Sequence, residues 1–417
     1  MPVENNETQT GRGRLQVSVF EVTMGAPAPN ALVKVNMPDG TLLNELITDS
    51  SGQTPSIVLP TPPLEYSLAA DSPQPYSSFD ITVTLDGFVP VIIKGVQVLP
   101  DEESFQNVYL YPTTFPDAEP QIITINPPVL WGDYPPKIPE DAVKPMPAPS
   151  GLVILEQVVI PEFMIVHDGA PTNASATNYW VPYKDYIKNV ASSEIYATWP
   201  EQTLIANILA INSFALNRVF TEWYRSRGFN FTITSSTAYD MAFSYGRNIY
   251  QEISVLVDEY FTTYITRPNI IQPLFTQFCD GQKVQCHGAM TQWGSKQMGE
   301  QGYFAMEILK SFYGSDIYLM QATQVEGIPY SFPGYNLQVG SRGAPVRTIQ
   351  SQLNVIANNY PAIGKLAVDG VYGQQTRASV ETFQQVFRLP ITGIVDMATW
   401  YQLSYIYVSV TRMAELK

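Results

Sequence analysis

Histidine and cysteine, two side chains often used in metal binding and nucleophilic catalysis, are scarce in this sequence. Its 417 residues include two histidines and two cysteines. This count excludes a metal site with three or more His ligands and a small fold held by disulfides, and it leaves little room for Ser-His-Asp chemistry. Catalysis in this chain is therefore expected to rest on carboxylates.

Glu194 is the leading candidate acid. It lies just ahead of a helix that we expect to begin near Pro200, among Ile195, Tyr196 and Trp199. Apolar surroundings disfavour the charged form of a carboxyl group, so a glutamate placed there can keep its proton and act as a general acid. The plainer interpretation is a solvated glutamate near a helix N-terminus, where carboxylates are favoured in any case.

Other side chains of the same region are possible helpers or sugar contacts, and the sequence does not rank them. Each is equally compatible with a packing or surface role, since aromatic side chains mostly fill cores. The candidate helpers are Asp185, Tyr186, Asp240, Asp258 and Glu259, and the candidate stacking aromatics are Trp199, Trp223, Trp293 and Tyr303.

Six residues lie between Cys279 and Cys286, and His287 follows directly. We expect a local disulfide that closes the loop CDGQKVQC. Free thiols remain an alternative, and so does zinc at Cys279, Cys286 and His287. The only other histidine, His167, is far away in sequence, so four zinc ligands are not evident and no cofactor is expected.

Charge and proline divide the chain unevenly. Residues 1–150 carry 18 acidic and 6 basic side chains, whereas residues 335–417 carry 4 acidic and 7 basic ones. A net charge of −15 argues against a general nucleic-acid binder. The sequence has no run of eighteen apolar residues and no apolar segment near its start, so we expect neither a membrane span nor a classical signal peptide.

Residues 1–112 are predicted to form an all-β sandwich. From residue 13 to 111 the sequence consists of short alternating or apolar runs between Pro, Gly, Asp and Ser clusters. The turn segments resemble those of carboxypeptidase-regulatory or transthyretin-like sandwiches. Between Pro112 and Pro149, 11 of 38 residues are proline, which predicts an extended linker over residues 113–150.

Residues 151–334 are predicted to be a mixed α+β domain. A stretch rich in β-branched residues opens it, and Leu204, Ile208, Ile211 and Ala215 have the spacing of one face of a long amphipathic helix. Further helices are expected near residues 248–260 and 298–313. In residues 335–417, helical patterns at 345–357, 374–387 and 397–405 alternate with Gly-rich turns and predict a three-helix bundle.

The C-terminal motifs closely resemble the peptidoglycan-binding domain 1 family. The glycines suit tight turns, and the apolar positions suit a small core, so most of these residues are expected to build the fold and not to touch glycan. The matching residues are Gly340, Arg342, Gly343, Val346, Ile349, Gln350, Leu353, Val368, Asp369, Gly370, Tyr372, Gly373, Thr376, Val380, Phe383, Gln384, Gly393, Val395, Thr399, Trp400 and Leu403.

Two blocks of the middle region resemble the SpoIID/LytB family. The first runs from Val181 to Glu194 and the second from Gly288 to Ser295. The resemblance implies that Glu194 is the catalytic acid and that Gln292, Trp293, Gly294 and Tyr303 belong to the substrate cleft. The chain departs from the family on the long helix, where Asn207 and Asn212 stand in place of the usual Gln and Arg.

The order of the four parts resembles the clostridial germination-specific spore cortex-lytic enzymes of the SleC type. That resemblance implies a zymogen stored in the spore, in the cortex and coat region, and released during germination. A subtilisin-like germination protease would cut near Ser150, Gly151, Leu152 and Val153, and the mature enzyme would cleave cortex peptidoglycan as a lytic transglycosylase. The alternative is a non-catalytic wall-binding scaffold that enhances a partner hydrolase, as in some SpoIID/LytB relatives.

Overall fold

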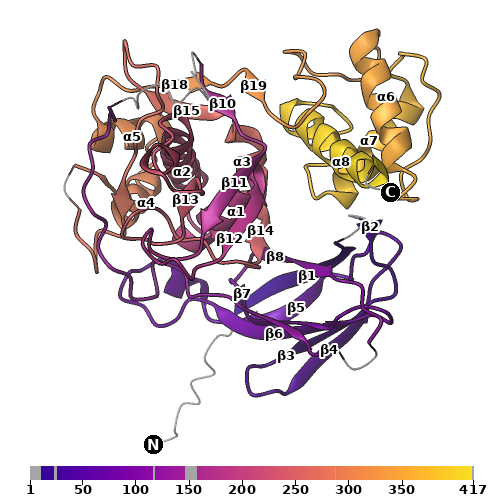
Figure 1. Ribbon diagram of the computed structural model, residues 1–417, viewed down its shortest axis with the longest axis horizontal. Coiled ribbons are helices and arrows are strands. Elements are labelled where there is room, and N and C mark those ends of the chain that lie inside the picture. Colours follow the sequence, from indigo (N-terminus) through magenta and orange to yellow (C-terminus); the bar gives the residue numbers. More distant parts are fainter. Residues whose placement is uncertain (1–10, 23–25, 116–117, 146–156, 287, 416–417) are drawn as a thin grey trace, which may run out of the picture.

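The computed structural model describes residues 11–22, 26–115, 118–145, 157–286 and 288–415. It is a multidomain protein with a β-rich N-terminal part, a central α+β part and a C-terminal helical part (Figure 1). The predicted cleavage residues Ser150, Gly151, Leu152 and Val153 lie outside the described residues, as does His287.

The N-terminal part is a sandwich of two sheets whose inner faces enclose an apolar core. Alternating burial along the strands explains the sequence pattern, since every second side chain faces that core. One sheet has the order β4-β3-β6-β7-β9, and the other contains β8, β1, β2 and β5. The strands are β1 Gly11–Glu21, β2 Ala26–Pro27, β3 Leu32–Asn36, β4 Leu42–Ile47, β5 Ile57–Thr61, β6 Ser77–Thr84, β7 Val91–Val98, β8 Glu103–Leu110 and β9 Gln121–Thr124; a 3-10 helix, η1, spans Leu64–Ser67.

The central part surrounds one long helix, α2, with shorter helices and small sheets. Its helices are α1 Tyr183–Glu194, α2 Glu201–Phe220, α3 Gln251–Tyr260, α4 Gln292–Glu300 and α5 Ala305–Tyr313, with a short 3-10 helix, η2, at Arg225–Arg227. Its strands are β10 Val159–Ile160, β11 Phe163–His167, β12 Asn178–Pro182, β13 Ile233–Thr234, β14 Ile249–Tyr250, β15 Thr263–Thr266, β16 Phe278–Cys279, β17 Met290–Thr291, β18 Tyr318–Gln321 and β19 Gln324–Val325.

Helix α2 differs from the amphipathic helix that the spacing predicted, because it is buried nearly all round. By length and composition it could cross a membrane, but 94% of its most apolar window is buried inside the protein, as in the core helix of a globular domain. The single helix expected at 298–313 is two helices, α4 and α5, because Gly302 interrupts the chain with a φ of +86°.

The C-terminal part is the predicted three-helix bundle, with α6 Ala344–Ile356, α7 Gln374–Val386 and α8 Met397–Glu415. The last helix extends ten residues beyond its expected end at residue 405. Its first half lies against the central part, where Tyr401 packs edge-on against Phe261 with ring centroids 5.4 Å apart.

The proline-rich segment is extended, as predicted, but it is not a free linker. Strand β9 adds to the sandwich by parallel pairing with β7. Beyond it, residues 126–145 cross the surface of the central part, and Leu130 and Lys144 are buried there. The sequence pattern showed only that this segment cannot form a helix; proline can also lie against another surface, because its fixed φ suits extended backbone.

The central part also completes the sandwich. Strand β14 pairs with β8 in the antiparallel sense, placing Ile249 opposite Phe105 and Tyr250 opposite Ser104. Near this junction lies Glu102. Burial, together with the negative charges of Glu252 on α3 and of Asp101, raises the pKa of Glu102 to about 8.

The protein should consequently lose stability as pH rises. A carboxyl group whose pKa is higher in the folded state favours folding most below its ordinary pKa of 4.5 and loses that contribution as the pH passes about 8. Glu102→Gln should reduce the fall in unfolding free energy between about pH 5 and about pH 9, by on the order of a few kcal/mol. Denaturant titrations across this range measure the effect, and identical pH profiles for variant and parent would contradict it.

Candidate active site

Glu194 lies ahead of the helix expected near Pro200, and it is also the last residue of a preceding helix, α1, which was not predicted. Helix α2 begins seven residues later, at Glu201, directly after Pro200. Only 1% of the Glu194 surface is exposed, which excludes the interpretation as a solvated surface residue. A helix C-terminus carries partial negative charge, so this position disfavours a carboxylate and favours its protonated form.

Two neutral donors hold the Glu194 side chain in place. The backbone N–H of Ala242 donates to Oε1 at 2.8 Å, and the Gln292 amide donates to Oε2 at 3.1 Å. The same amide nitrogen donates to the Glu194 backbone oxygen at 2.9 Å. Gln292, the first residue of α4, is thus bonded to the last residue of α1, and the structure brings the sequence blocks 181–194 and 288–295 together at this contact.

Burial raises the pKa of Glu194 above its ordinary value. The positive charge of Lys137 and the donors on Ala242 and Gln292 oppose this shift without cancelling it. The Tyr186 hydroxyl and Gln292 Oε1 are buried nearby without hydrogen-bond partners of their own. The raised pKa favours the protonated form of this carboxyl, and the unpaired polar atoms near it suit donation of a proton to a ligand.

Lys137 was not predicted as a site residue, because nothing in a proline-rich stretch marks one lysine as special. It comes from the segment expected to be a linker, and its ammonium group donates to the backbone oxygens of Asp240 and Thr237. It also lies 4.9 Å from the centre of the Phe278 ring. Burial lowers the pKa of Lys137, although the charge of Glu194 opposes that shift.

The two asparagines of α2, Asn207 and Asn212, have structural partners in this chain. Asn207 donates to Ser295 Oγ at 2.8 Å, which fixes α4 against α2. Asn212 donates to the Thr263 oxygen at 2.7 Å and accepts from the Tyr183 hydroxyl at 2.6 Å. The positive charge acting on Glu194 therefore comes from Lys137 and not from α2.

Three aromatic side chains that follow Glu194 or its partner Gln292 in the sequence pack against one another. Trp199 and Trp293 have ring centroids 5.0 Å apart, and Tyr196 meets Trp293 edge-on at 6.3 Å. The sandwich covers this cluster through η1, because the Trp199 indole N–H donates to the Ser67 oxygen at 2.9 Å and Lys296 donates to the Leu68 oxygen at 2.5 Å.

Gly294 and Tyr303 occupy different positions relative to this cluster. A Cβ at Gly294 would meet Thr291 Oγ1 at 2.2 Å, so its small size serves packing of the first turn of α4. Tyr303 follows α4 and is 43% exposed. Among the predicted contacts, only Gln292 reaches Glu194 by a hydrogen bond, and Trp293 lies in the adjoining aromatic cluster.

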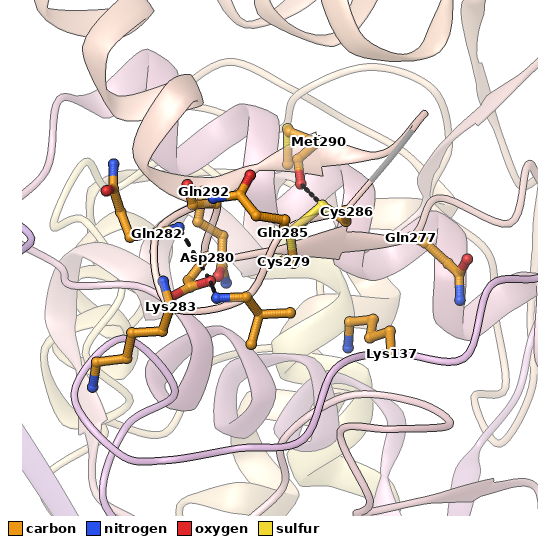
Figure 2. The surroundings of a disulfide bond; sticks show 12 residues. Lys137, Gln277, Cys279, Asp280, Gln282, Lys283, Gln285, Cys286, Met290 and Gln292 are labelled. Carbon is orange, nitrogen blue, oxygen red and sulfur yellow. Dashed lines mark hydrogen bonds between the residues drawn. A yellow bond between two sulfur atoms is a disulfide. The ribbon is translucent and has the colours of Figure 1, made fainter.

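Cys279 and Cys286 form a disulfide, drawn in Figure 2. The Asp280 carboxylate accepts from the backbone N–H groups of Lys283 and Val284, both at 2.8 Å, and so shapes the closed loop. The Asp280 backbone oxygen accepts from the N–H of Trp293 at 3.2 Å. The loop therefore supports the first turn of α4, the turn that carries Gln292.

Most of the candidate helpers are committed elsewhere. Asp240 accepts from Arg218, Tyr224 and Thr234, and Asp258 binds Lys184 and Lys188 at 2.9 and 2.8 Å. The Asp185 carboxylate lies 3.5 Å from the Tyr405 hydroxyl on α8, whereas Glu259 is exposed.

Two other ring side chains also have partners away from Glu194. The Trp223 ring lies under Arg227, with 3.6 Å between the ring centre and the guanidinium. His167 accepts or donates to Asn178 at 2.8 Å and stacks on Phe231.

Within the described residues, no group of three or more His, Cys, Asp or Glu side chains is placed to hold a metal ion. The zinc alternative relied on His287, which is outside those residues, and on two cysteines that are joined to each other.

In the C-terminal bundle, the motif residues are engaged in the fold. Gln350 donates to Asp369 at 2.9 Å and accepts from the N–H of Gly370 at 2.9 Å. Gln384 accepts from the N–H of Gly393 at 2.9 Å and donates to Thr399 at 3.1 Å. These bonds tie the loops between helices to α6 and α7.

Comparisons with known proteins identify this bundle. Residues 342–403 match the family model described as a peptidoglycan binding domain, so the C-terminal bundle is similar to that domain. Over 78 residues the chain is 40% identical to the zinc D-Ala-D-Ala carboxypeptidase of Streptomyces albus G. The match covers 18% of this chain and only 29% of that protein's length.

Solved structures align with single parts of the chain. The SleB N-terminal domain is 30% identical, with a TM-score of 0.16, over 18% of this chain and 97% of its own. The 5-hydroxyisourate hydrolase of Klebsiella pneumoniae is 14% identical, with a TM-score of 0.17, over 24% of this chain and 91% of its own. The Bacillus anthracis TIE protein is 17% identical, with a TM-score of 0.18, over 25% and 18% of the two chains.

Removing the disulfide should destabilise the protein. Closing so short a loop contributes roughly 2 to 3 kcal/mol through the entropy of the unfolded chain. Replacement of both Cys279 and Cys286 by Ser should lower the unfolding free energy by about that amount, measured by denaturant titration. Dithiothreitol should produce a similar loss in the parent and none in the double variant; a double variant as stable as the oxidised parent would refute the role given to the loop.

Proposed function

We propose that this chain is the precursor of a lytic transglycosylase that cleaves the β-1,4 bond between N-acetylmuramic acid and N-acetylglucosamine in spore cortex peptidoglycan. The observation that carries the proposal is Glu194, a buried carboxyl with a raised pKa, held by Gln292 beside an aromatic cluster. The peptidoglycan binding domain on the same chain supports a wall glycan as the substrate.

In the proposed reaction Glu194 acts first as an acid. Its proton passes to the glycosidic oxygen, the bond to the anomeric carbon of the muramyl residue breaks, and positive charge develops on that sugar ring. The C6 hydroxyl of the same sugar then attacks the anomeric carbon and gives up its proton to the Glu194 carboxylate. The product is a 1,6-anhydro end, and the acid is restored without water.

One carboxyl group suffices for this route, because the nucleophile belongs to the substrate and has a high effective concentration. A hydrolase would instead use a second carboxylate within about 5 to 9.5 Å to activate water or to form a glycosyl intermediate. The carboxylate that shares Lys137 and Tyr186 as neighbours with Glu194 is Asp240, and it is occupied by hydrogen bonds from Arg218, Tyr224 and Thr234. This favours the intramolecular reaction over hydrolysis.

The proposal includes activation by proteolysis. Residues before position 146 contribute both covers of the site, the segment with Lys137 and the η1 turn with Ser67. A subtilisin-like germination protease would cut near Ser150–Val153, in the spore cortex and coat region. The part after residue 150 has 17 basic and 20 acidic side chains, compared with 6 and 18 before it, so separation would leave an enzyme less repelled by an acidic wall.

Replacement of Glu194 by Gln tests the chemistry. In protein freed of its N-terminal part, Glu194→Gln should reduce release of glycan fragments from decoated spores by about 10²- to 10⁴-fold, because the proton donor is lost. Binding to sacculi should be unchanged, since that belongs to the C-terminal bundle. Glu201→Gln, an exposed acid at the start of α2, is the matched control and should retain activity.

The products distinguish the reaction class. Fragments with 1,6-anhydro ends resist borohydride reduction, whereas ends produced by hydrolysis are reduced. Fragments whose ends are reduced by borohydride would show that the enzyme is a hydrolase and not a transglycosylase. A freed protein that binds sacculi and never clears them would instead favour the non-catalytic scaffold.

A further inference from the structure

The N-terminal and central parts are joined by far more than the peptide bonds between them. The contacts that join the two parts have one partner at or before residue 145 and the other at or after residue 157, so a cut between these positions breaks none of them. The question is whether the contacts can hold two separate chains together.

The proline-rich segment contributes a series of backbone hydrogen bonds. They extend along its length and use side-chain amides of the central part as well as its backbone, so the segment is bound like an extended peptide in a groove. The bonds are Val129 N to Ser193 O at 2.8 Å, Ile138 N to Ala238 O at 2.7 Å, Glu140 N to Gln277 Oε1 at 3.0 Å, Phe275 N to Ala142 O at 2.8 Å and Lys144 N to Gln272 Oε1 at 2.9 Å.

Two charged residues fix the end of this segment. Glu140 accepts two hydrogen bonds from the Arg218 guanidinium, at 2.7 and 3.1 Å, and the Arg218 side chain is fully buried. Lys144 binds Glu140 at 2.9 Å and lies 3.8 Å from the centre of the Phe275 ring. Departure of the segment would leave Arg218 with Asp240 as its remaining acidic partner, and loss of one partner from a buried ionic group is costly.

The sandwich itself adds a second contact region around β14. Arg247 of the central part donates to Gln97 Oε1 at 2.8 Å, and Asn248 exchanges hydrogen bonds with the Gln97 backbone at 2.7 and 3.0 Å. On the other side, Arg388 of the C-terminal bundle donates to Gln16 at 3.1 Å and lies 4.0 Å from the Phe105 ring centre. The N-terminal part therefore contacts both of the others.

We propose that the N-terminal fragment remains bound after the cut, as a non-covalent inhibitor of the rest of the chain, and that its separation is a distinct second step. The partner of this surface is the fragment ending at the cut. Cutting changes an intramolecular contact into a bimolecular one, so the fragment leaves only on dilution or by competition. Retention stands on the contacts alone, whereas inhibition also rests on the proposed function.

The experiment uses the full chain with a recognition sequence for a site-specific protease placed within residues 146–156. After complete cutting, the two fragments are analysed by size-exclusion chromatography and sedimentation at micromolar concentration, and sacculus clearing is followed in parallel. We expect the fragments to co-elute, and clearing to begin only after the N-terminal fragment is removed by an affinity tag under mild denaturant. Separation of the fragments at once on cutting would overturn retention.

Glu140→Gln in the same cut protein tests the segment. Each variant is folded as the uncut chain and checked by circular dichroism before cutting. Loss of the negative charge that pairs with Arg218 should raise the dissociation constant of the fragments at least about tenfold, whereas Asp141→Asn at the exposed neighbour should not change it. Equal constants for the two variants would contradict the role of Glu140 in retention.

The binding and clearing results separate the two proposals. Co-eluting fragments that clear sacculi immediately would overturn the inhibition. Fragments that co-elute, and a purified C-terminal fragment that never clears sacculi, would refute the proposed function while supporting retention.

Discussion

The structure of the candidate site depends on one unfavourable placement, a carboxyl group buried at the C-terminal end of a helix. Glu194 is buried from water and lies at the C-terminal end of α1, where the helix carries partial negative charge. Both conditions favour its protonated form. Gln292 and Ala242 supply neutral hydrogen bonds that fix the group without ionising it. The aromatic cluster, the disulfide loop and the packing of α4 on α2 all serve to keep Gln292 in reach of this carboxyl.

The burial of Glu194 bears on the proposed activation as well as on the proposed acid role. Exclusion of water keeps this carboxyl protonated, but a glycan must reach it for the proposed reaction. The segments that shield it would therefore have to be removable. Here Lys137 approaches from the proline-rich segment and η1 lies over Trp199. Both come from the part of the chain before residue 146, so under the proposed activation a cut would separate them from the residues that form the candidate site.

Most of the secondary structure could be predicted from the sequence, because hydrophobic periodicity and turn residues are local properties of the chain. The sandwich, α3 and the C-terminal bundle follow their patterns closely. The amphipathic character predicted for α2 was wrong, because apolar spacing on one face says nothing about small and polar residues buried on the others. The break at Gly302 and the position of Glu194 at the end of α1 depend on backbone geometry that spacing does not specify.

The sequence predicted only those site residues that lie within a continuous motif. Glu194 and Gln292 were identified from two motif blocks, and the structure brings them within 3.1 Å. Lys137, Ser67 and Ala242 carry no local signal, since their importance arises from contacts between distant segments. The role of Arg218 as partner of both Glu140 and Asp240 likewise appears only when three separate segments meet.

The hydrogen bonds of Gln350 and Gln384 have a consequence for how wall affinity can evolve. Both glutamines hold loops to helices. Keeping glutamine at these positions would keep the conformation of the bundle, while residues on its outer surface could vary. Val339 and Ile391 are apolar side chains on that surface, 45% and 60% exposed. Preference for one wall polymer over another can therefore change by surface substitution while the recognisable motif stays intact.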